Sequence, residues 1–148
     1  MASGSPEPKD YHQVLEQHQA MKALLSRLDK LLKQETTAVD EVAQLLGELG
    51  DRLVKHFTLE EEGGYFSEAL MHAPRLISRA NELMAQHPKM TTEARQLAVD
   101  LQSVRGSANW RQETRKRFEA FRRELTRHEQ SEDRLLQEAY TRDIGSAD

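Results

Sequence analysis

The sequence predicts an all-α protein folded as an antiparallel up-down-up-down four-helix bundle. Of its 148 residues, 31% are charged and 37% hydrophobic, with only 7 glycines and 4 prolines. This composition is typical of long helices. Four segments carry apolar residues at alternating steps of three and four, which is the spacing of helices packed in a bundle. No stretch shows the alternating Val, Ile, Tyr and Thr pattern expected of strands.

The first helix follows a short leader. Residues 1–9 are small, polar and proline-rich, and we expect them to be a disordered leader before a single domain over residues 10–145. Asp10 can cap the helix, with Gln13 as its capping-box partner. The apolar pattern then continues to about Gln34.

The second helix is predicted to begin after Thr36 or Thr37. Asp40 stands in the capping-box position relative to Thr37. The apolar pattern of this segment reaches about Leu70.

The last two helices have similar start and stop signals. The third is predicted to open at Pro74, since proline is favoured in a first helical turn, and to end near Val104. The fourth is predicted to open at Asn109, with Gln112 as capping-box partner, and to end near Asp143. Short loops between the four helices favour the antiparallel bundle.

The four apolar stripes are interrupted only by a few polar residues. His12 and His72 lie off the stripes and are expected at the surface. On the stripes, each helix carries one histidine, and the second and fourth helices also carry one glutamate. These six residues are His18, His56, Glu60, His87, His128 and Glu132.

These six residues are expected at one level of the bundle. His18 lies about 17 residues before the first turn and His56 about 21 after it, and the other four show similar spacings from their turns. With a rise of about 1.5 Å per residue, all six fall within about one helical turn. Burying a polar group without a partner costs on the order of several kcal/mol, so six in one layer need a common explanation.

A metal centre would explain this layer. In the two pairs His56–Glu60 and His128–Glu132, the imidazole and the carboxylate are four residues apart and share a helix face. Nitrogen and oxygen donors suit iron, manganese or zinc, and disfavour calcium and magnesium. We therefore expect two iron ions joined by an oxo or hydroxo bridge, with open positions for a small ligand; zinc or manganese would fit the same donors. The chain has no cysteine, which excludes disulfides, iron–sulfur clusters and thiolate chemistry.

The pattern resembles the hemerythrin-like, HHE cation-binding domains, over about residues 10–145. The family pattern of a lone histidine, HxxxE, a lone histidine and HxxxE matches His18, "HFTLE" at 56–60, "AQHPK" around His87 and "HEQSE" at 128–132. The resemblance implies that the four histidines are terminal ligands. It further implies that the two glutamates bridge or chelate two irons.

The chain departs from the oxygen-carrying hemerythrins in two ways. Those carriers have a second histidine four residues from the one in the third helix, and an aspartate in place of the second glutamate. Here Leu83 and Thr91 stand four residues from His87, and the fourth helix has Glu132. This departure disfavours reversible oxygen transport. It favours binding, sensing or detoxification of oxygen, peroxide or nitric oxide, or iron-linked signalling.

Two other classes of function stay open from the sequence. A di-iron oxidase or peroxidase-type enzyme would need more carboxylates and a Glu-x-x-His pattern, and no histidine here has a glutamate three residues before it. A metal-free helical interaction module would need no metal at all. No residue is assigned a catalytic role, and the sequence leaves open whether the protein is an enzyme.

Several residues near the histidines are expected to adjust the site. Pro88 removes a backbone hydrogen bond, so the third helix should kink beside His87. Gly63–Gly64 should loosen the second helix. Tyr65 is a candidate extra ligand or hydrogen-bond donor, and Glu61 either faces solvent or supports a ligand.

Charge and hydropathy limit the remaining partners. The net charge of −4 gives no electrostatic reason to expect nucleic acid. No apolar run of about 18 residues would span a membrane, and the first nine residues lack the apolar segment of a secretory signal. The expected location is the cytoplasm, and the expected partner is a diatomic ligand or peroxide.

Overall fold

The computed structural model describes residues 11–62 and 65–139. The predicted leader at 1–9, the predicted cap Asp10 and the predicted helix end near Asp143 lie outside the described residues. The elements in chain order are α1 (Tyr11–Lys33), α2 (Val39–Glu62), α3 (Tyr65–His72), the 3-10 helix η1 (Pro74–Leu76), α4 (Ile77–Ala85), α5 (His87–Val104) and α6 (Trp110–Gln137).

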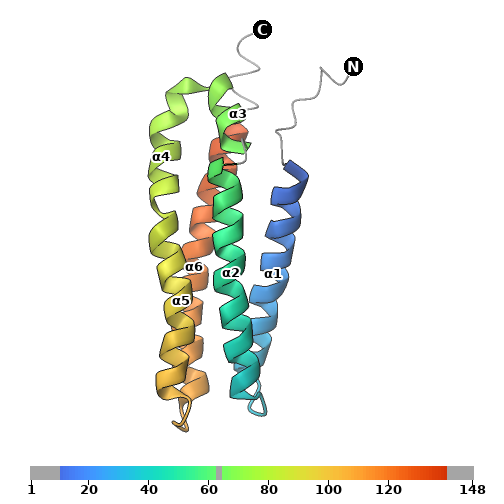
Figure 1. Cartoon of the computed structure of the whole chain (residues 1–148), viewed down its shortest axis with the longest axis vertical. Coiled ribbons are helices and arrows are strands. Elements are labelled where there is room, and N and C mark those ends of the chain that lie inside the picture. Colours follow the sequence, from blue (N-terminus) through green and yellow to red (C-terminus); the bar gives the residue numbers. More distant parts are fainter. Residues whose placement is uncertain (1–10, 63–64, 140–148) are drawn as a thin grey trace.

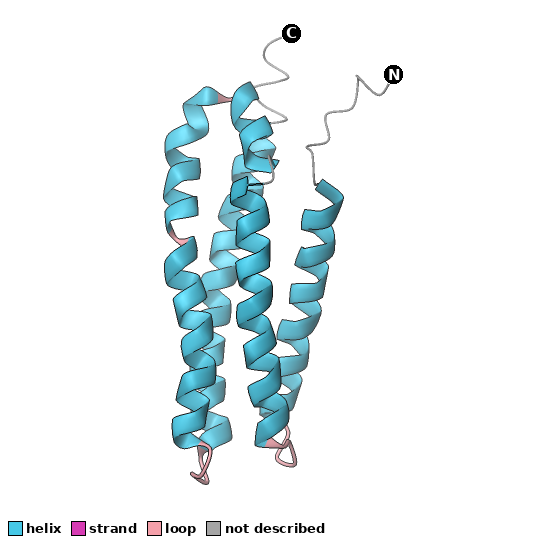
Figure 2. Ribbon diagram, viewed as in Figure 1, coloured by secondary structure: helices cyan, strands magenta, loops and turns pink. Residues whose placement is uncertain are grey.

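The helices form the predicted four-helix bundle. Four columns run along the long axis, made by α1, α2 with α3 above it, α4 with α5, and α6 (Figure 1). The α1–α2 and α5–α6 loops lie together at one end, and the α3–η1–α4 corner lies at the other (Figure 2). Both α1 and α5 pack against α2 and α6, so each column neighbours two others. The described residues include no strand.

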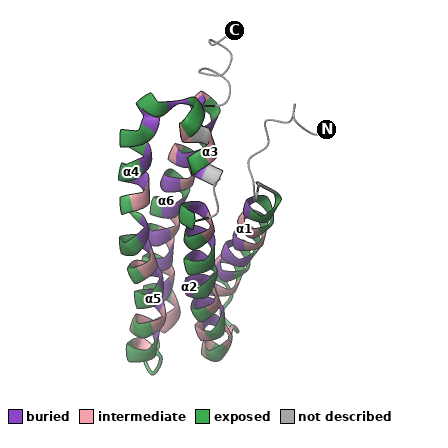
Figure 3. Ribbon diagram, turned by 45° about the horizontal axis from the view of Figure 1, so that its top comes forward, coloured by how far each residue is buried: buried purple, intermediate pink, exposed green. Residues whose placement is uncertain are grey.

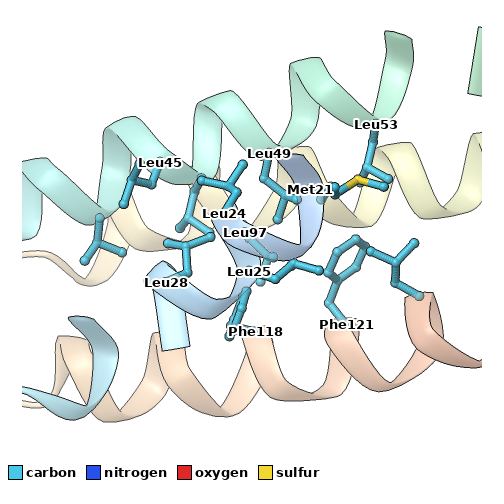
Figure 4. Packing of buried hydrophobic residues seen from close by; sticks show 14 of the residues in the cluster. Met21, Leu24, Leu25, Leu28, Leu45, Leu49, Leu53, Leu97, Phe118 and Phe121 are labelled. Atoms are coloured by element: carbon cyan, nitrogen blue, oxygen red, sulfur yellow. The ribbon is translucent and has the colours of Figure 1, made fainter. Parts of the chain in front are cut away.

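The core consists of two hydrophobic clusters at different heights. The larger lies between α1, α2, α5 and α6 and includes Leu28, Leu49, Leu53, Phe118 and Phe121 (Figure 4). The smaller lies between α3, η1, α4 and the last turns of α6. Buried residues line the inner faces of the helices, and exposed residues cover the outside (Figure 3). No helix in the described part of the chain has the length and apolar character needed to cross a membrane.

The predicted helix caps at Thr37 and Asn109 have different outcomes. The Thr37 hydroxyl donates a 2.6 Å hydrogen bond to the carbonyl of Leu31 at the end of α1, and α2 begins only at Val39, so the cap at Thr37 is wrong. Asn109 is the N-cap residue of α6, as predicted, but its side chain makes no capping hydrogen bond. Its backbone N–H donates to the Ser107 hydroxyl at 3.1 Å.

The third predicted helix is divided, and the second is described in two parts. α2 ends at Glu62 and α3 begins at Tyr65; the predicted continuity of this helix and its loosening at Gly63–Gly64 fall on residues that lie outside the described part of the chain. The predicted kink beside Pro88 is confirmed, because a turn at Gln86 separates α4 from α5. α5 therefore begins at His87, which directly follows this break.

The larger cluster should account for much of the stability. Leu28 on α1 is fully buried, so Leu28→Ala should lower the free energy of unfolding by roughly 2–5 kcal/mol through lost burial and a residual cavity. Leu15 on the same helix is 39% exposed, and Leu15→Ala should change stability by about 0.5 kcal/mol or less. Urea unfolding of both variants measures this, and equal losses would contradict the assigned core.

Candidate metal centre

The six polar residues predicted from the stripes come together in one layer of the bundle. His56, Glu60, His87, His128 and Glu132 are each 3% exposed or less. The side chain of His18 is 19% exposed. Along α6, the layer separates Leu125 of the larger cluster from Leu135 of the smaller one. The predicted convergence is therefore present in the fold, and the assignment of the six residues as ligands stays a prediction.

The polar side chains form two overlapping groups, which we name by their histidines. The His18/His56 half-site contains His18, His56, Glu60, Glu129 and Glu132, and the His87/His128 half-site contains Glu60, His87, His128 and Glu132. Within each group, one donor atom per residue lies within 4.8 Å of the others. Glu60 and Glu132 belong to both groups. Two adjacent cations sharing these two carboxylates would fit this arrangement.

In the His87/His128 half-site, all donor atoms point at one centre. Nε2 of His87 and Nε2 of His128 lie 3.1 Å apart. Both approach Oε2 of Glu132, at 3.2 Å and 2.8 Å respectively. Nε2 of His87 also lies 3.3 Å from Oε1 of Glu60. A cation at this centre would meet nitrogen from two helices and oxygen from two.

The hydrogen bonds made by Nδ1 of His87 and by Nδ1 of His128 hold the orientation of each ring. His87 donates from Nδ1 to the Glu61 carboxylate at 2.6 Å, and His128 donates from Nδ1 to the Gln86 side-chain oxygen at 2.8 Å. When both rings are neutral, this leaves the lone pair of each ring on Nε2, and the two inner lone pairs face one another and a carboxylate. Their repulsion disappears when a cation or a proton lies between them.

Glu61 thus has the supporting role that was one of its two predicted alternatives. Its side chain is 45% exposed, yet it bonds to the buried ring of His87. The helix break makes Gln86 the equivalent partner of His128, since Gln86 is the turn residue between α4 and α5. A carboxylate or amide behind a metal-binding imidazole holds its tautomer and orientation.

An aromatic side chain also orients the rings. Phe57 stacks on His87 with ring centroids 3.8 Å apart and planes 3° from parallel. It meets the edge of His128 at 5.7 Å. Phe57 is 3% exposed and directly follows His56 on α2, a position that the stripe analysis did not single out.

The His18/His56 half-site contains a residue that the sequence reasoning missed. Nε2 of His18 lies 2.5 Å from Oε2 of Glu129, and Nε2 of His56 lies 3.1 Å from Oε2 of Glu60 and 3.8 Å from Oε2 of Glu129. Nε2 of His56 meets these carboxylates as ion-pair contacts without hydrogen-bond geometry, and Nδ1 of His56 is buried without a hydrogen-bond partner among the described residues. Buried polar atoms without partners are rare unless another group satisfies them.

A signal for Glu129 was available in the sequence. Glu129 is three residues before Glu132, and residues at this spacing share a helix face. Widening the predicted core stripe by one residue beyond His128 would have included Glu129.

The electrostatics of the His18/His56 half-site follow from its carboxylates. Burial acts to lower the pKa of His56, but the nearby carboxylates of Glu129 and Glu60 outweigh it and raise the pKa to about 9. Burial acts to raise the pKa of Glu60, but the imidazoles of His56 and His87 outweigh it and lower the pKa to about 2. Glu60 therefore offers a charged carboxylate at neutral pH.

In the His87/His128 half-site, the pKa values of the carboxylate and the imidazole shift in the opposite directions. Burial raises the pKa of Glu132 well above its ordinary value, and the negative charge of Glu60 adds to the rise. Burial and the neighbouring charge of His87 lower the pKa of His128 to about 4. Glu60 and Glu132 are thus difficult to ionise together unless positive charge is added between them.

The remaining predictions near the site have mixed outcomes. His12 and His72 are exposed, as predicted. The side chain of Tyr65 lies outside the described part of the structure, so its predicted role stays a prediction. Leu83 is buried and Thr91 is half-buried, and neither offers a second imidazole beside His87.

A bundle of four helices with a buried histidine and glutamate cluster defines a cation-binding helical protein. The sequence matches the family described as hemerythrin HHE cation binding domain over residues 9–140, and the chain belongs to this family. Comparisons with curated proteins and with solved structures gave no match.

The electrostatics of Glu132 predict that one substitution stabilises the metal-free protein. Because the pKa of Glu132 is raised, this residue makes the metal-free protein less stable as the pH rises above its ordinary pKa of 4.5. Glu132→Gln removes that ionisation, and the new amide can donate to the inner lone pairs of His87 and His128. The metal-free variant should be more stable than the metal-free parent at pH 8, by roughly 1 kcal/mol, with a smaller gain at pH 5.

Urea unfolding of chelator-treated protein at both pH values measures this gain. Glu16→Gln, at an exposed position on α1, is the control and should change neither value. A Glu132→Gln variant that is less stable than the parent at pH 8 would contradict the described electrostatics.

Proposed function

We propose that the chain is a non-haem di-iron protein that binds two iron ions, joined by an oxo or hydroxo bridge, in the core of the bundle. The proposed ligands are the four histidines His18, His56, His87 and His128 and the two shared glutamates Glu60 and Glu132. The main support is one observation: Nε2 of His87 and Nε2 of His128 lie 3.1 Å apart, and Nε2 of His128 lies 2.8 Å from a carboxylate oxygen of Glu132.

The charges of the layer support two cations rather than one. Glu60 and Glu132 belong to both half-sites, and the imidazoles divide into two pairs on either side of them. Two divalent ions carry four positive charges, of which two carboxylates neutralise half; a bridging oxide or hydroxide would neutralise more. Nitrogen and oxygen donors without sulfur suit iron, and they would also accept zinc or manganese.

The role we propose is to bind, sense or detoxify a small ligand such as oxygen, peroxide or nitric oxide. Bound iron would supply the affinity and redox chemistry toward such ligands. Neither Leu83 nor Thr91, the residues four positions from His87, supplies the further histidine of the oxygen carriers, which argues against reversible transport. A cytoplasmic location and the absence of a nucleic-acid partner complete the proposal, in keeping with a cysteine-free chain of net charge −4.

A di-iron oxidase or peroxidase-type enzyme is the second candidate. The observation that favours it is Glu129, a third carboxylate beside the histidines, because such enzymes use more carboxylates. A metal-free interaction module fits less well, since the unpartnered polar atoms of His56, Glu60 and Glu132 would then stay unsatisfied.

Metal analysis of the purified protein tests the proposal. We expect two irons per chain and near-ultraviolet absorption from the oxo bridge. His56→Ala and His128→Ala should each lower the iron content sharply, because each removes a terminal ligand. His72→Ala, at an exposed position, is the matched control. An unchanged iron content in both ligand variants would contradict the assignment, and zinc or manganese in the parent protein would correct the metal.

Metal removal should lower stability in a pH-dependent way. The pKa of His56 is about 9 in the metal-free protein, so metal binding at pH 7 should release at least one proton. Because protons compete with metal for the imidazole, the stabilisation by metal should be larger at pH 8 than at pH 6. Thermal unfolding of metal-loaded and chelated protein, and calorimetric titration in buffers of different ionisation enthalpy, measure both effects. Equal melting temperatures of the two forms would refute the prediction.

A further inference from the structure

Glu129 occupies the position of a ligand, although it is not among the six proposed ones. Its Oε2 lies 2.5 Å from Nε2 of His18 and 3.8 Å from Nε2 of His56. Its donor atom shares the 4.8 Å group with Glu60 and Glu132. Glu129 differs from Glu60 and Glu132 in that it belongs to one half-site only and has a side-chain exposure of 18%.

The two half-sites differ in the hydrogen bonds that support their imidazoles and in their number of donor residues. In the His87/His128 half-site, each imidazole has an outer partner, and Phe57 stacks on one ring. In the His18/His56 half-site, neither ring nitrogen of His56 has a hydrogen-bond partner in the described chain. Glu129 supplies this half-site with a fifth donor, whereas the other half-site has four.

Glu129 also faces the solvent side of the site. A pocket of about 190 Å³ lies between α1 and α6, with His18 and Glu129 in its wall. Met21, Leu25 and Leu125 give the pocket an apolar lining. This volume is below the roughly 300 Å³ of pockets that hold larger organic ligands, so it suits small molecules.

His56 does not line this pocket and is fully buried, so Glu129 and His18 stand between the pocket and His56. A pocket of about 350 Å³ borders His128 on the other side of α6. There His128 contacts Gln86 through Nδ1, and its Nε2 is directed toward Glu132. Of these two pockets, the one between α1 and α6 borders the His18/His56 half-site, and the other borders the His87/His128 half-site.

We propose that Glu129 is a seventh metal ligand that occupies, on the cation of the His18/His56 half-site, the position facing the α1–α6 pocket. A small anion or diatomic molecule then reaches this cation only when the Glu129 carboxylate moves aside. This inference rests on the proposed function, because it requires cations in the layer.

The third carboxylate changes the charge of the whole site. Two divalent cations with three carboxylates keep one positive charge, whereas two carboxylates leave two. The cation of the His18/His56 half-site is thus held more tightly, and an entering anion finds less positive charge. Lys22 lines the same pocket, so an anion that enters is accompanied by a positive charge.

Cobalt(II) is a suitable probe, because its visible spectrum reports each change of donor. The full chain is loaded with cobalt, and both binding constants, the visible spectrum and the affinity for azide are measured. Glu129→Gln keeps the shape of the side chain and removes its charge. We expect it to weaken binding of one cobalt ion by about tenfold or more, to change the visible spectrum, and to bind azide about tenfold more tightly. Glu129→Asp keeps a carboxylate and should restore part of the cobalt affinity.

Glu113→Gln is the matched control, since Glu113 is exposed in the first turn of α6, away from this pocket, and the change removes the same charge. It should leave all three measurements unchanged, and an effect equal to that of Glu129→Gln would overturn the proposal. An unchanged cobalt spectrum and affinity in Glu129→Gln would overturn ligation, and an unchanged azide affinity would overturn the blocking role. Failure of the parent protein to bind two cobalt ions would instead refute the proposed function, so the two failures are distinguishable.

Discussion

The whole structure depends on one constraint: a layer of imidazoles and carboxylates is buried in the middle of an otherwise apolar bundle. The helices gain stability from leucine-rich clusters above and below this layer, but the layer itself contains polar atoms without partners. The opposed pKa shifts of Glu60 and Glu132 have the same origin, because two adjacent buried carboxylates cannot easily both be charged. The cations that we propose would remove both difficulties at once, and the site and the fold would then stabilise each other.

The path of the backbone prepares the two half-sites differently. The turn at Gln86 starts a new helix at His87 and brings the amide of Gln86 behind His128. Together with Glu61 and Phe57, this turn holds the rings of one half-site from outside. The other half-site lacks such support at His56 and borders a pocket. Rigidity on one side and access on the other suit a centre that retains its metals and admits a small ligand.

The chain belongs to the HHE cation binding family, and the layer of histidines and glutamates is the feature of the fold that fits this membership. Leu83 and Thr91, four residues from His87, add no further imidazole to the His87/His128 half-site. Glu129 adds a carboxylate to the other half-site. The two half-sites therefore differ in their donors and in their charge.

The sequence by itself determined the bundle and the six core polar residues, because apolar spacing and distance from each turn are properties of a regular helix. It also predicted the break beside Pro88, since proline lacks a backbone donor. The cap at Thr37 was wrong, and Asn109 lacks the predicted side-chain bond, because these hydrogen bonds depend on how each turn closes. Only the tertiary structure decided the contacts of Glu129, Glu61, Gln86 and Phe57. Each stands next to one of the core polar residues in the chain, and its contacts come from a neighbouring helix, whose distance and rotation no single-helix pattern contains.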